Sequence, residues 1–531
     1  MPCEPGRNAV EPFLTKHARA VIGTLSGFDR LVFRGMLRLL AHCGGMMSYL
    51  WAVLGLLKDF ASHAEAMTQR LRDASEALAR RTGRPIRYLP SSATNKEEIA
   101  REIARADGIK SGLICILTTV EVCQSYEIVR DRESKHLQLQ PRHRKCLHLY
   151  HDQIHPVFGF MHARIQTWFP FAVQICLNGR EWLARSIQAE GLGYVQRDNC
   201  FTWLEDPERA QHLMDQQVRS AWPDLLNDIA RTLNPAHAAM FQAFPVEYYW
   251  STHQSEWATD IMFRDARSLA ALYPNLVHHA MTTFQSPDVL RFLGHKVPAS
   301  GNIPPRLQAE VASDMKRRPE GVRVKHRVGA NSVTMYDKQG SVLRVETTIN
   351  DVDGFKTFRS PEGKPDAPKS QQRMRKGIAD LHRRTETSQA CNDRYLRAMA
   401  SAADTTPLGE LTARLGRPVR RKGRRVRPMN PCAPNDARLI ETVSRGEFVI
   451  NGFRNRDLRQ LLFADAQASK DEQRRHAAAV SRQIALLRAH RLVRKVPGTH
   501  RYQLSAKGRI IVTALILLRN IGTEALSKLA A

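Results

Sequence analysis

Acidic side chains beside apolar, strand-like runs are the first candidates for chemistry in this sequence. Asp29 stands in GFDRLVF at the start of one such run, and Glu121 ends another, LICILTTVE. Carboxylates that neighbouring strands bring together can hold a divalent cation for in-line attack on a phosphodiester. Asp29 and Glu121 are therefore candidate acids of a catalytic metal site, together with a third acid. Spacing alone does not define the third acid. The candidates are Asp152, Asp198, Glu256 and Asp260, and we include Asp152 in the predicted site.

Two of these acids also fit a structural role. Glu256 and Asp260 stand four residues apart in SEWATDIMFRD, and Arg264 follows four residues later. Spacing by four is typical of ion pairs along a helix. The segment is therefore either a helical ladder of ion pairs or a source of active-site acids.

Histidines and a carboxylate alternate along two other strand-like runs. Period-two spacing places His148 and Asp152 on one face of the run 145–152, and His162 on one face of the run 159–168. If the residues between the runs form a turn, a histidine and a carboxylate face His162 across an antiparallel ladder. Such a set can bind a divalent metal or act in acid–base catalysis. The alternative is a polar sheet face whose groups bind one another or nucleic-acid phosphates.

The segment NSVTMYDKQGSVLRVETTIN (331–350) predicts a β-hairpin, with strand formers on both sides of the turn residues DKQG. Alternation places Arg344 and Glu346 on the same face of the second arm. They form either a structural ion pair or part of an active site, so Glu346 is a candidate catalytic residue. Because the preceding segment is strongly basic, we expect Lys325 and Lys338 to contact nucleic acid.

The charge of the chain predicts a polyanionic partner. Its 80 Lys and Arg residues against 52 Asp and Glu residues leave a formal net charge of +28. Much of this charge is arginine, whose planar fork suits phosphates and base edges. Nucleic acid is therefore the expected partner, with DNA favoured and RNA as the alternative.

Composition divides the chain into three regions. Residues 1–359 mix strand-like and helical runs, which predicts an α/β or α+β region with a mixed sheet, in one domain or two. Residues 360–434 are rich in Pro, Gly and Lys and predict a basic, partly disordered connector. The predicted strands are 20–25, 30–37, 113–121, 145–152, 159–168 and 171–178. The predicted helices are 56–81, 96–106, 209–233, where Pro223 should kink or split the helix, and a short one in the connector near 378–399. The connector residues expected to contact nucleic acid are Arg420, Arg421, Lys422, Arg424 and Arg425.

Residues 435–531 predict three helices, two short strands around a PGTH turn, and a final helix. This order, and the segment LLRAHRLVRKVPGTHRYQLSAKG (486–508), resemble the winged-helix DNA-binding domain of MarR-like regulators. The resemblance implies a recognition helix at 471–490, with a wing after it that approaches a minor groove or phosphates. The DNA-contacting residues it implies are Arg474, Arg475, Ser481, Arg482 and Gln483 on the helix and His500 and Arg501 in the wing.

Two short resemblances concern catalysis. The pattern MYDKQGSVLRVETTI is similar to a stretch of the rolling-circle replication initiators of filamentous phages and plasmids, which nick DNA through a tyrosine. It implies that Tyr336 or another tyrosine is the nucleophile and that Glu346 is a metal-site acid. The order of Asp29 and Glu121 along the chain resembles that of the acids in RNase H-like nucleases, in which two such acids bind Mg²⁺.

The sequence does not support several other classes of protein. No GxxxxGK[ST] or GxGxxG run is present, so neither an ATP-driven motor nor a dinucleotide enzyme is predicted. The apolar runs 46–57 and 510–518 are shorter than a bilayer span, and the N-terminal residues lack a signal-peptide core. The nine cysteines form no CxxC pair. We expect a cytoplasmic protein without a membrane partner, and a homo-oligomer remains open.

These observations lead to one principal interpretation and one alternative. The principal one is a DNA-processing protein of a mobile element, a nuclease or transposase-like enzyme that uses Mg²⁺ or Mn²⁺ and is targeted by a winged helix. The alternative is a non-enzymatic winged-helix transcription regulator, or a protein that binds structured RNA or DNA.

Overall fold

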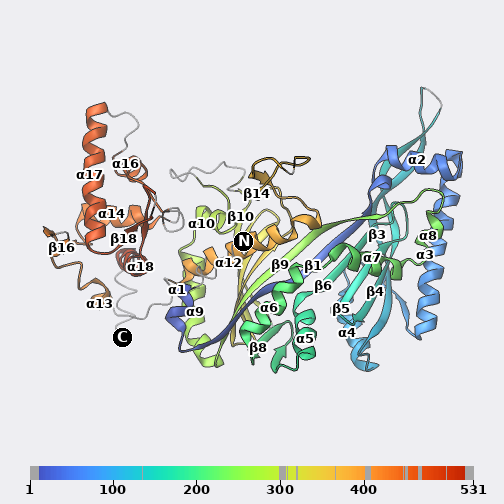
Figure 1. Ribbon diagram of the computed structural model, residues 1–531, viewed down its shortest axis with the longest axis horizontal. Helices are drawn as coiled ribbons and strands as arrows, with labels where there is room; N and C mark the ends of the chain where they lie inside the picture. The colour runs from blue at the N-terminus through green and yellow to red at the C-terminus, as the bar shows by residue number, and fades with distance from the viewer. Residues whose placement is uncertain are drawn as a thin grey trace. The chain divides into compact units, whose positions relative to one another are not determined.

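The computed structural model describes most of the chain (Figure 1). The described residues are 11–133, 136–297, 307, 309–318, 321–364, 366–400, 408–421, 423–445, 448, 452–463, 469–497 and 499–520.

A mixed sheet of 11 strands dominates the structure, in agreement with the predicted mixed sheet with helices (Figure 1). Its spatial order is β10-β11-β12-β13-β9-β1-β6-β5-β4-β3-β2. Strand β2 pairs with β3 in parallel, whereas the ladders from β3 to β6 and from β10 to β12 are antiparallel. The strands are β1 (Val21–Leu37), β2 (Ile86–Tyr88), β3 (Gly112–Arg130), β4 (Leu137–His155), β5 (Gly159–Gln166), β6 (Val173–Asn178), β9 (Tyr248–Phe263), β10 (Val311–Arg318), β11 (Gly321–Val328), β12 (Asn331–Lys338) and β13 (Val342–Ile349).

The order of strands follows the same path twice. After β1 come helices and then the run from β3 to β6, whose last strand returns beside β1. After β9 come helices and then the run from β10 to β13, whose last strand returns beside β9. Strands β1 and β9 are neighbours and run antiparallel, because Arg264 N donates to Ala20 O at 2.8 Å and Ser251 Oγ donates to Arg34 O at 3.3 Å.

The predicted strands and hairpin are largely confirmed. The two runs predicted before residue 38 form one continuous strand, β1, and the predicted strands from 113 to 178 correspond to β3, β4, β5 and β6. The hairpin 331–350 is formed by β12 and β13. Its turn contains Gln339 and Gly340, with φ of 52° and 70°, a left-handed conformation that the turn residues in this segment tolerate.

The helices of the first 300 residues follow local sequence signals. Helix α4 occupies the predicted 96–106, where the side chain of Asn95 accepts a hydrogen bond from Glu98 N at the helix start. Pro223 splits the predicted helix 209–233, because it begins a new helix rather than continuing the old one. The helices are α1 (Glu11–His17), α2 (Cys43–Val53), α3 (Phe60–Thr82), α4 (Lys96–Ala106), α5 (Gly179–Ala189), α6 (Pro207–Val218), α7 (Trp222–Leu233), α8 (His237–Met240), α9 (Ala266–Thr282) and α10 (Ser286–Phe292).

The chain divides into two compact units that do not follow the boundaries predicted at 359 and 434. One comprises Leu25–Ala258 and Thr348–Thr385, and its core contains Phe33, Tyr49 and Trp222 among many apolar side chains. The other comprises Met1–Thr24, Thr259–Thr347 and Glu386–Ala531. Strands β1, β9 and β13 each contribute residues to both units.

The predicted connector contains the helix expected near 378–399 and two hairpins that its composition does not suggest. Its described part holds α12 (Leu381–Met399), α13 (Leu408–Thr412) and the end of a hairpin made by β14 (Lys356–Arg359) and β15 (Ser370–Arg373). The basic run forms a second hairpin, β16 (Val419–Arg421) with β17 (Arg424–Val426). Arg427 closes it with two hydrogen bonds to Asp436, of 2.6 and 2.8 Å. The expectation of a disordered basic run is therefore wrong for these residues.

The C-terminal residues form a helical group with a small two-stranded ladder. Phe453 and Tyr502 add a bridge to that ladder, and Leu439, Val480 and Leu487 lie in the shared core. A capping box of Ser469 and Glu472 begins α17. The elements are α14 (Pro434–Ser444), α16 (Asn455–Phe463), α17 (Lys470–Ala489), β18 (Val493–Lys495), β19 (Tyr502–Leu504) and α18 (Ala506–Asn520).

Among the described helices, none combines the length and the apolar character that crossing a bilayer requires. The apolar run 46–57 lies mostly in α2, where Met46, Tyr49 and Leu50 are buried in the core.

Candidate metal centre

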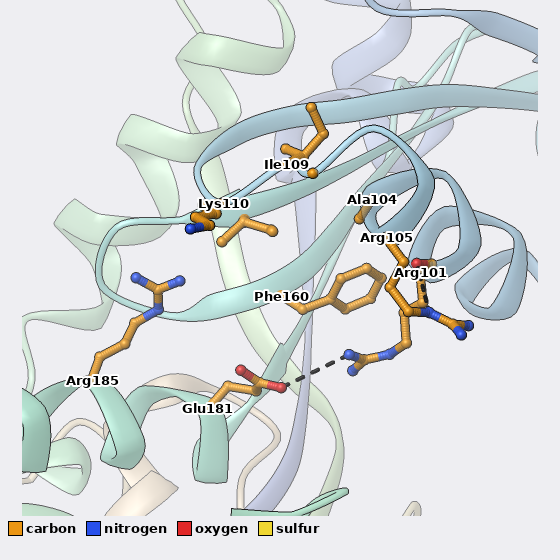
Figure 2. A pocket seen from close by; sticks show the side chains of 10 residues that line it. Arg101, Ala104, Arg105, Ile109, Lys110, Phe160, Glu181 and Arg185 are labelled. Atoms are coloured by element: carbon orange, nitrogen blue, oxygen red, sulfur yellow. Dashed lines mark hydrogen bonds and ion pairs between the residues drawn. The ribbon is translucent and has the colours of Figure 1, made fainter.

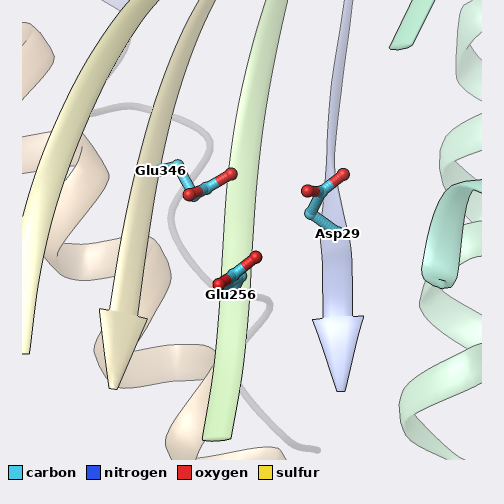
Figure 3. A group of neighbouring side chains, drawn as sticks. All are labelled: Asp29, Glu256 and Glu346. Carbon is cyan, nitrogen blue, oxygen red and sulfur yellow. The ribbon is translucent and has the colours of Figure 1, made fainter. Parts of the chain in front are cut away.

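Three carboxylates from three neighbouring strands converge: Asp29 on β1, Glu256 on β9 and Glu346 on β13 (Figure 3). One oxygen of each lies within 4.8 Å of the others. Asp29 and Glu346 are each 6% exposed, and Glu256 is half-buried. We call these three residues the acid cluster. The sequence named Asp29 and Glu346 by separate arguments and held Glu256 as one of several possible third acids.

The strands that carry the acid cluster also anchor it in the core. Phe28 of β1 and Trp257 of β9 meet edge to face, with ring centroids 4.9 Å apart. Since successive side chains of a strand point to opposite faces, Asp29 and Glu256 project together from the other face. The aromatic pair on one side thus fixes where the two carboxylates lie on the other.

Neutral amides hold two of the carboxylates in place. Asn199, in the turn between β7 (Tyr194–Arg197) and β8 (Cys200–Leu204), donates its side-chain amide to both oxygens of Asp29, at 3.0 and 2.9 Å. Gln254 donates its side-chain amide to Glu256 at 2.7 Å. An amide orients a carboxylate and leaves its negative charge intact, so the cluster keeps its attraction for a cation.

The segment of Glu256 and Asp260 is a strand and not the helix that spacing by four suggested. Residues four apart on a strand share a face at a distance of about 13 Å, too far for the predicted ladder of ion pairs. Asp260 instead accepts two hydrogen bonds from Arg344, at 2.6 and 2.9 Å, and both side chains are at most 1% exposed. The face that Arg344 and Glu346 share therefore carries a buried ion pair next to a buried acid.

Glu121 does not belong to the acid cluster. Strands β6, β5 and β4 lie between β1 and β3, a separation of about 19 Å at the usual strand spacing. Glu121 accepts a hydrogen bond from the Tyr150 hydroxyl at 2.6 Å and forms ion pairs with Arg164 at 3.0 Å and Lys96 at 3.7 Å. The predicted pairing of Asp29 with Glu121 is wrong, and Glu121 is held in a network of structural contacts.

Asp152 and His162 do face each other across the antiparallel ladder, as the spacing predicted. Asp152 is 1% exposed, and neither of its oxygens has a hydrogen-bond partner among the described residues. Burial raises the pKa of Asp152 well above its usual value and lowers the pKa of His162 to about 4. His162 is therefore uncharged near neutral pH, and burial favours the neutral form of Asp152, which suits a packed sheet interior better than metal binding or general-base catalysis.

Most of the residues predicted to bind nucleic acid lie at the surface. Lys338 does not: it is 7% exposed, with its ammonium 5.9 Å from the Tyr336 ring centroid, so it is not part of an exposed basic face. Lys422 lies outside the described residues. The exposed ones are Arg420, Arg424, Arg425, Arg474, Arg475, Ser481, Arg482 and His500, and the half-buried ones are Arg421, Gln483, Arg501 and Lys325.

Comparison with known proteins assigns neither a family nor a function to the chain. The chain matches no protein-family model, no curated protein and no solved structure. Its function has to be argued from the chemistry of its own residues.

Proposed function

We propose that the protein is a metal-dependent nuclease that cuts DNA, and that the acid cluster is its catalytic centre. The observation that carries this proposal is the convergence of Asp29, Glu256 and Glu346 within 4.8 Å of one another. A chain with a formal net charge of +28 supplies the matching preference for a polyanionic substrate. A DNA-processing role in a mobile element, as a nuclease or a transposase-like enzyme, is the setting that fits both features.

The donor atoms of the acid cluster fit a hard divalent cation. Carboxylate oxygens are the ligands that Mg²⁺ and Mn²⁺ prefer. Three carboxylates at this spacing repel one another when all are ionised, and a cation relieves that repulsion. A bound divalent cation would stabilise the negative charge that develops on a phosphodiester under attack. Asp29, Glu256 and Glu346 would hold it.

Side chains next to the acid cluster would orient the substrate. Asn199 and Gln254 fix two carboxylates, so that little rearrangement is needed when a substrate arrives. Arg30 lies beside the cluster, with its Nε 4.0 Å from Glu256 and its side chain 47% exposed. Its guanidinium also lies 3.8 Å from Glu97, and its exposed part can contact a phosphate that approaches from solvent.

We further propose that the C-terminal elements form a winged-helix domain that delivers DNA. The order α14, α16, α17, β18, β19, with the bridge between Phe453 and Tyr502, supports this proposal. Helix α17 would be the recognition helix, since Arg474, Arg475 and Arg482 are exposed on it while Val480 and Leu487 are buried.

A second function is favoured by the same C-terminal elements. A helix with exposed arginines can bind DNA without any catalytic centre, so a transcription regulator or a binder of structured RNA or DNA remains the alternative. In that case the acid cluster would be a structural feature of the sheet, stabilised by Asn199 and Gln254.

The experiment that separates the two functions is a cleavage assay. Supercoiled plasmid is incubated with the protein and Mg²⁺ or Mn²⁺, and nicked and linear products are quantified. The nuclease proposal expects products that disappear when EDTA is added. Tight DNA binding with no product under any of these conditions would favour the regulator.

A further inference from the structure

A cavity of about 500 Å³ lies at the C-terminal end of α4, next to α5 and the turn that joins β4 to β5 (Figure 2). Its volume falls within the range of about 300–1,000 Å³ that small-molecule sites occupy. All its lining residues belong to the unit that contains Leu25–Ala258, and none is a member of the acid cluster.

The rim of this cavity carries four cations. Arg101 and Arg105 come from α4, Lys110 from the turn after it, and Arg185 from α5. Arg101 is paired with Glu97 at 3.0 Å and with Glu181 at 3.8 Å. In the described chain, Arg105, Lys110 and Arg185 make no ion pair within 4.0 Å, and the Nε of Arg185 is buried without a hydrogen-bond partner. Arg105 and Arg185 each donate one hydrogen bond to a backbone carbonyl, at 3.3 and 3.4 Å, and Glu181 is the one acid in the lining. The cations outnumber the acid, so the cavity has capacity for an anion.

The floor of the cavity is apolar. Phe160, Ile109 and Ile154 line it, and Figure 2 shows the Phe160 ring at its centre. The guanidinium carbon of Arg101 lies 4.1 Å from the centroid of that ring, a cation–π contact that holds both groups in place. A ligand that fits both rim and floor combines an anionic group with a flat apolar part.

Gly159 lies where β5 approaches α5 beside the cavity. Its φ of 67° lies in the left-handed region, and a Cβ there would come within 2.8 Å of the Glu181 Cβ and 3.2 Å of the Arg185 Nε. A side chain at this position would push Glu181 and Arg185 of α5 away from β5. Gly159 is thus a positioning residue, since it lets α5 approach closely enough for Arg185 to reach the cavity.

We propose that this cavity binds a nucleoside monophosphate unit, with its phosphate on Arg105, Lys110 and Arg185 and its base against Phe160 and the two isoleucines. A phosphate dianion matches several unpaired cations better than a single carboxylate does. A planar base suits an aromatic and aliphatic floor. The unit is either a free mononucleotide or the 5′-phosphorylated end of a nucleic-acid strand. The assignment does not depend on the acid cluster or on cleavage.

Isothermal titration of the full chain with AMP, at low salt and with EDTA present, tests the proposal. We expect AMP to bind at least about tenfold more tightly than either adenosine or inorganic phosphate, because only AMP engages both rim and floor. Lys110→Ala and Arg185→Gln should each weaken AMP binding by about tenfold. Lys58→Ala, which removes an exposed lysine elsewhere in the same unit, should change it less than twofold.

A second set of measurements distinguishes the two ligand sources. Stronger binding of a 5′-phosphorylated oligonucleotide than of its unphosphorylated form, lost in Lys110→Ala, would assign the cavity to strand ends. Equal binding of the two oligonucleotides together with tight AMP binding would assign it to free nucleotides. Gly159→Ala, with folding checked by near-UV circular dichroism, should weaken AMP binding in either case. AMP that binds no better than phosphate, or that binds equally to the wild type and to Lys110→Ala and Arg185→Gln, would overturn the proposal.

Discussion

At the scale of single residues, the buried pair of Arg344 and Asp260 shows how closely stability and the acid cluster are connected. Asp260 follows Glu256 by four residues on β9, and Arg344 precedes Glu346 by two on β13. The pair therefore helps to fix the two strands that carry two of the three acids. Removal of one partner leaves the other charge buried without this counter-ion, which costs much more than loss of an exposed pair.

We expect Asp260→Asn to lower the free energy of unfolding by about 3–5 kcal/mol, measured by urea denaturation. The matched control is Asp228→Asn, which breaks an ion pair with Arg231 whose side chains are 71% and 67% exposed. That change should cost about 0–1 kcal/mol. Equal destabilisation by the two variants would contradict the assignment of Arg344 and Asp260 as a desolvated pair.

A buried histidine makes the stability of the fold depend on pH. His151 of β4 is 2% exposed and lies 3.1 Å from the Ser75 hydroxyl, and burial lowers its pKa to about 4. The unfolded chain takes up a proton near pH 6.5, which the folded chain resists. The stability that neutral His151 contributes is therefore present above pH 6.5 and is lost as the pH falls towards 4.

We expect the free energy of unfolding of the wild type to fall between pH 6.5 and 4, by up to about 1.4 kcal/mol per unit of pKa difference for this one group. His151→Gln retains a hydrogen-bonding side chain and does not titrate, so its stability should decline less over the same range. Parallel pH profiles for the variant and the wild type would show that His151 is not the group responsible. Asp152 has the opposite effect on the free energy of unfolding: burial raises its pKa, so its contribution to stability is larger at low pH and is lost as the pH rises.

Two of the three acids in the cluster could be predicted from the sequence, and there is a physical reason why the third could not. Asp29 and Glu346 could be named because each stands within a clear run of strand-forming residues. Glu256 was harder, since spacing by four in SEWATDIMFRD imitates a helical pattern of charges. Trp257, Thr259 and Ile261 are strand formers that recur at every second residue, and this is the signal of a strand that could have decided the matter.

At the scale of elements, α17 is where sequence specificity is expected to lie. Its apolar side chains Val480, Ile484 and Leu487 are buried in the C-terminal core, while Arg475 and Arg482 are exposed. Ser481, also predicted to contact DNA, accepts a hydrogen bond from the side chain of Asn455 on α16 at 2.9 Å. The arginines are therefore the better probes of base recognition.

We expect Arg475→Ala and Arg482→Ala to weaken binding to a cognate site by about 1–3 kcal/mol for each base that the arginine would otherwise bind, and to weaken binding to random DNA much less. Replacing Arg420 and Arg425 of the β16–β17 hairpin with alanine should weaken binding to all DNA sequences alike. Fluorescence anisotropy on both kinds of DNA gives the comparison. If the α17 variants lose affinity equally for cognate and random DNA, this helix does not read sequence.

Helices were easier to predict than the connector because their signals are local. The apolar periodicity and the cap of α4 lie within a dozen residues, and Pro223 marks a break by its own geometry. The helix of the connector near 378–399 could be predicted, but the hairpin of its basic run could not, because the composition of that run is that of a solvated chain. Its structure depends on partners far along the sequence, such as Asp436 for Arg427 and the C-terminal core for Leu415 and Met429.

At the scale of the whole molecule, the formal net charge of +28 should govern association with nucleic acid. Binding that neutralises phosphates releases counterions, so affinity falls linearly with salt on logarithmic axes. Six to ten phosphate contacts would reduce the affinity by about 10³–10⁵ between 50 and 200 mM salt. Anisotropy titrations across this range measure the slope, and an affinity that does not change with salt would remove the polyanion interpretation.

The strand order is what the sequence could not supply. Residues 29, 256 and 346 are far apart in the chain, and they meet because β9 lies beside β1 and β13 returns to β9 in a sheet of 11 strands. Local patterns define a strand and its two faces but not its neighbours. The same limit explains why Glu121 was paired with Asp29 although three strands separate them.

The central claim is that the acid cluster holds a divalent cation for cleavage of DNA, and Glu346→Gln tests it most directly. The amide keeps the shape of the side chain and removes its charge. We expect Mg²⁺- or Mn²⁺-dependent nicking of plasmid to fall by at least about 100-fold, with Mn²⁺ binding by calorimetry weakened and with folding and DNA affinity unchanged. A Glu346→Gln protein that nicks DNA and binds Mn²⁺ as well as the wild type would contradict the claim.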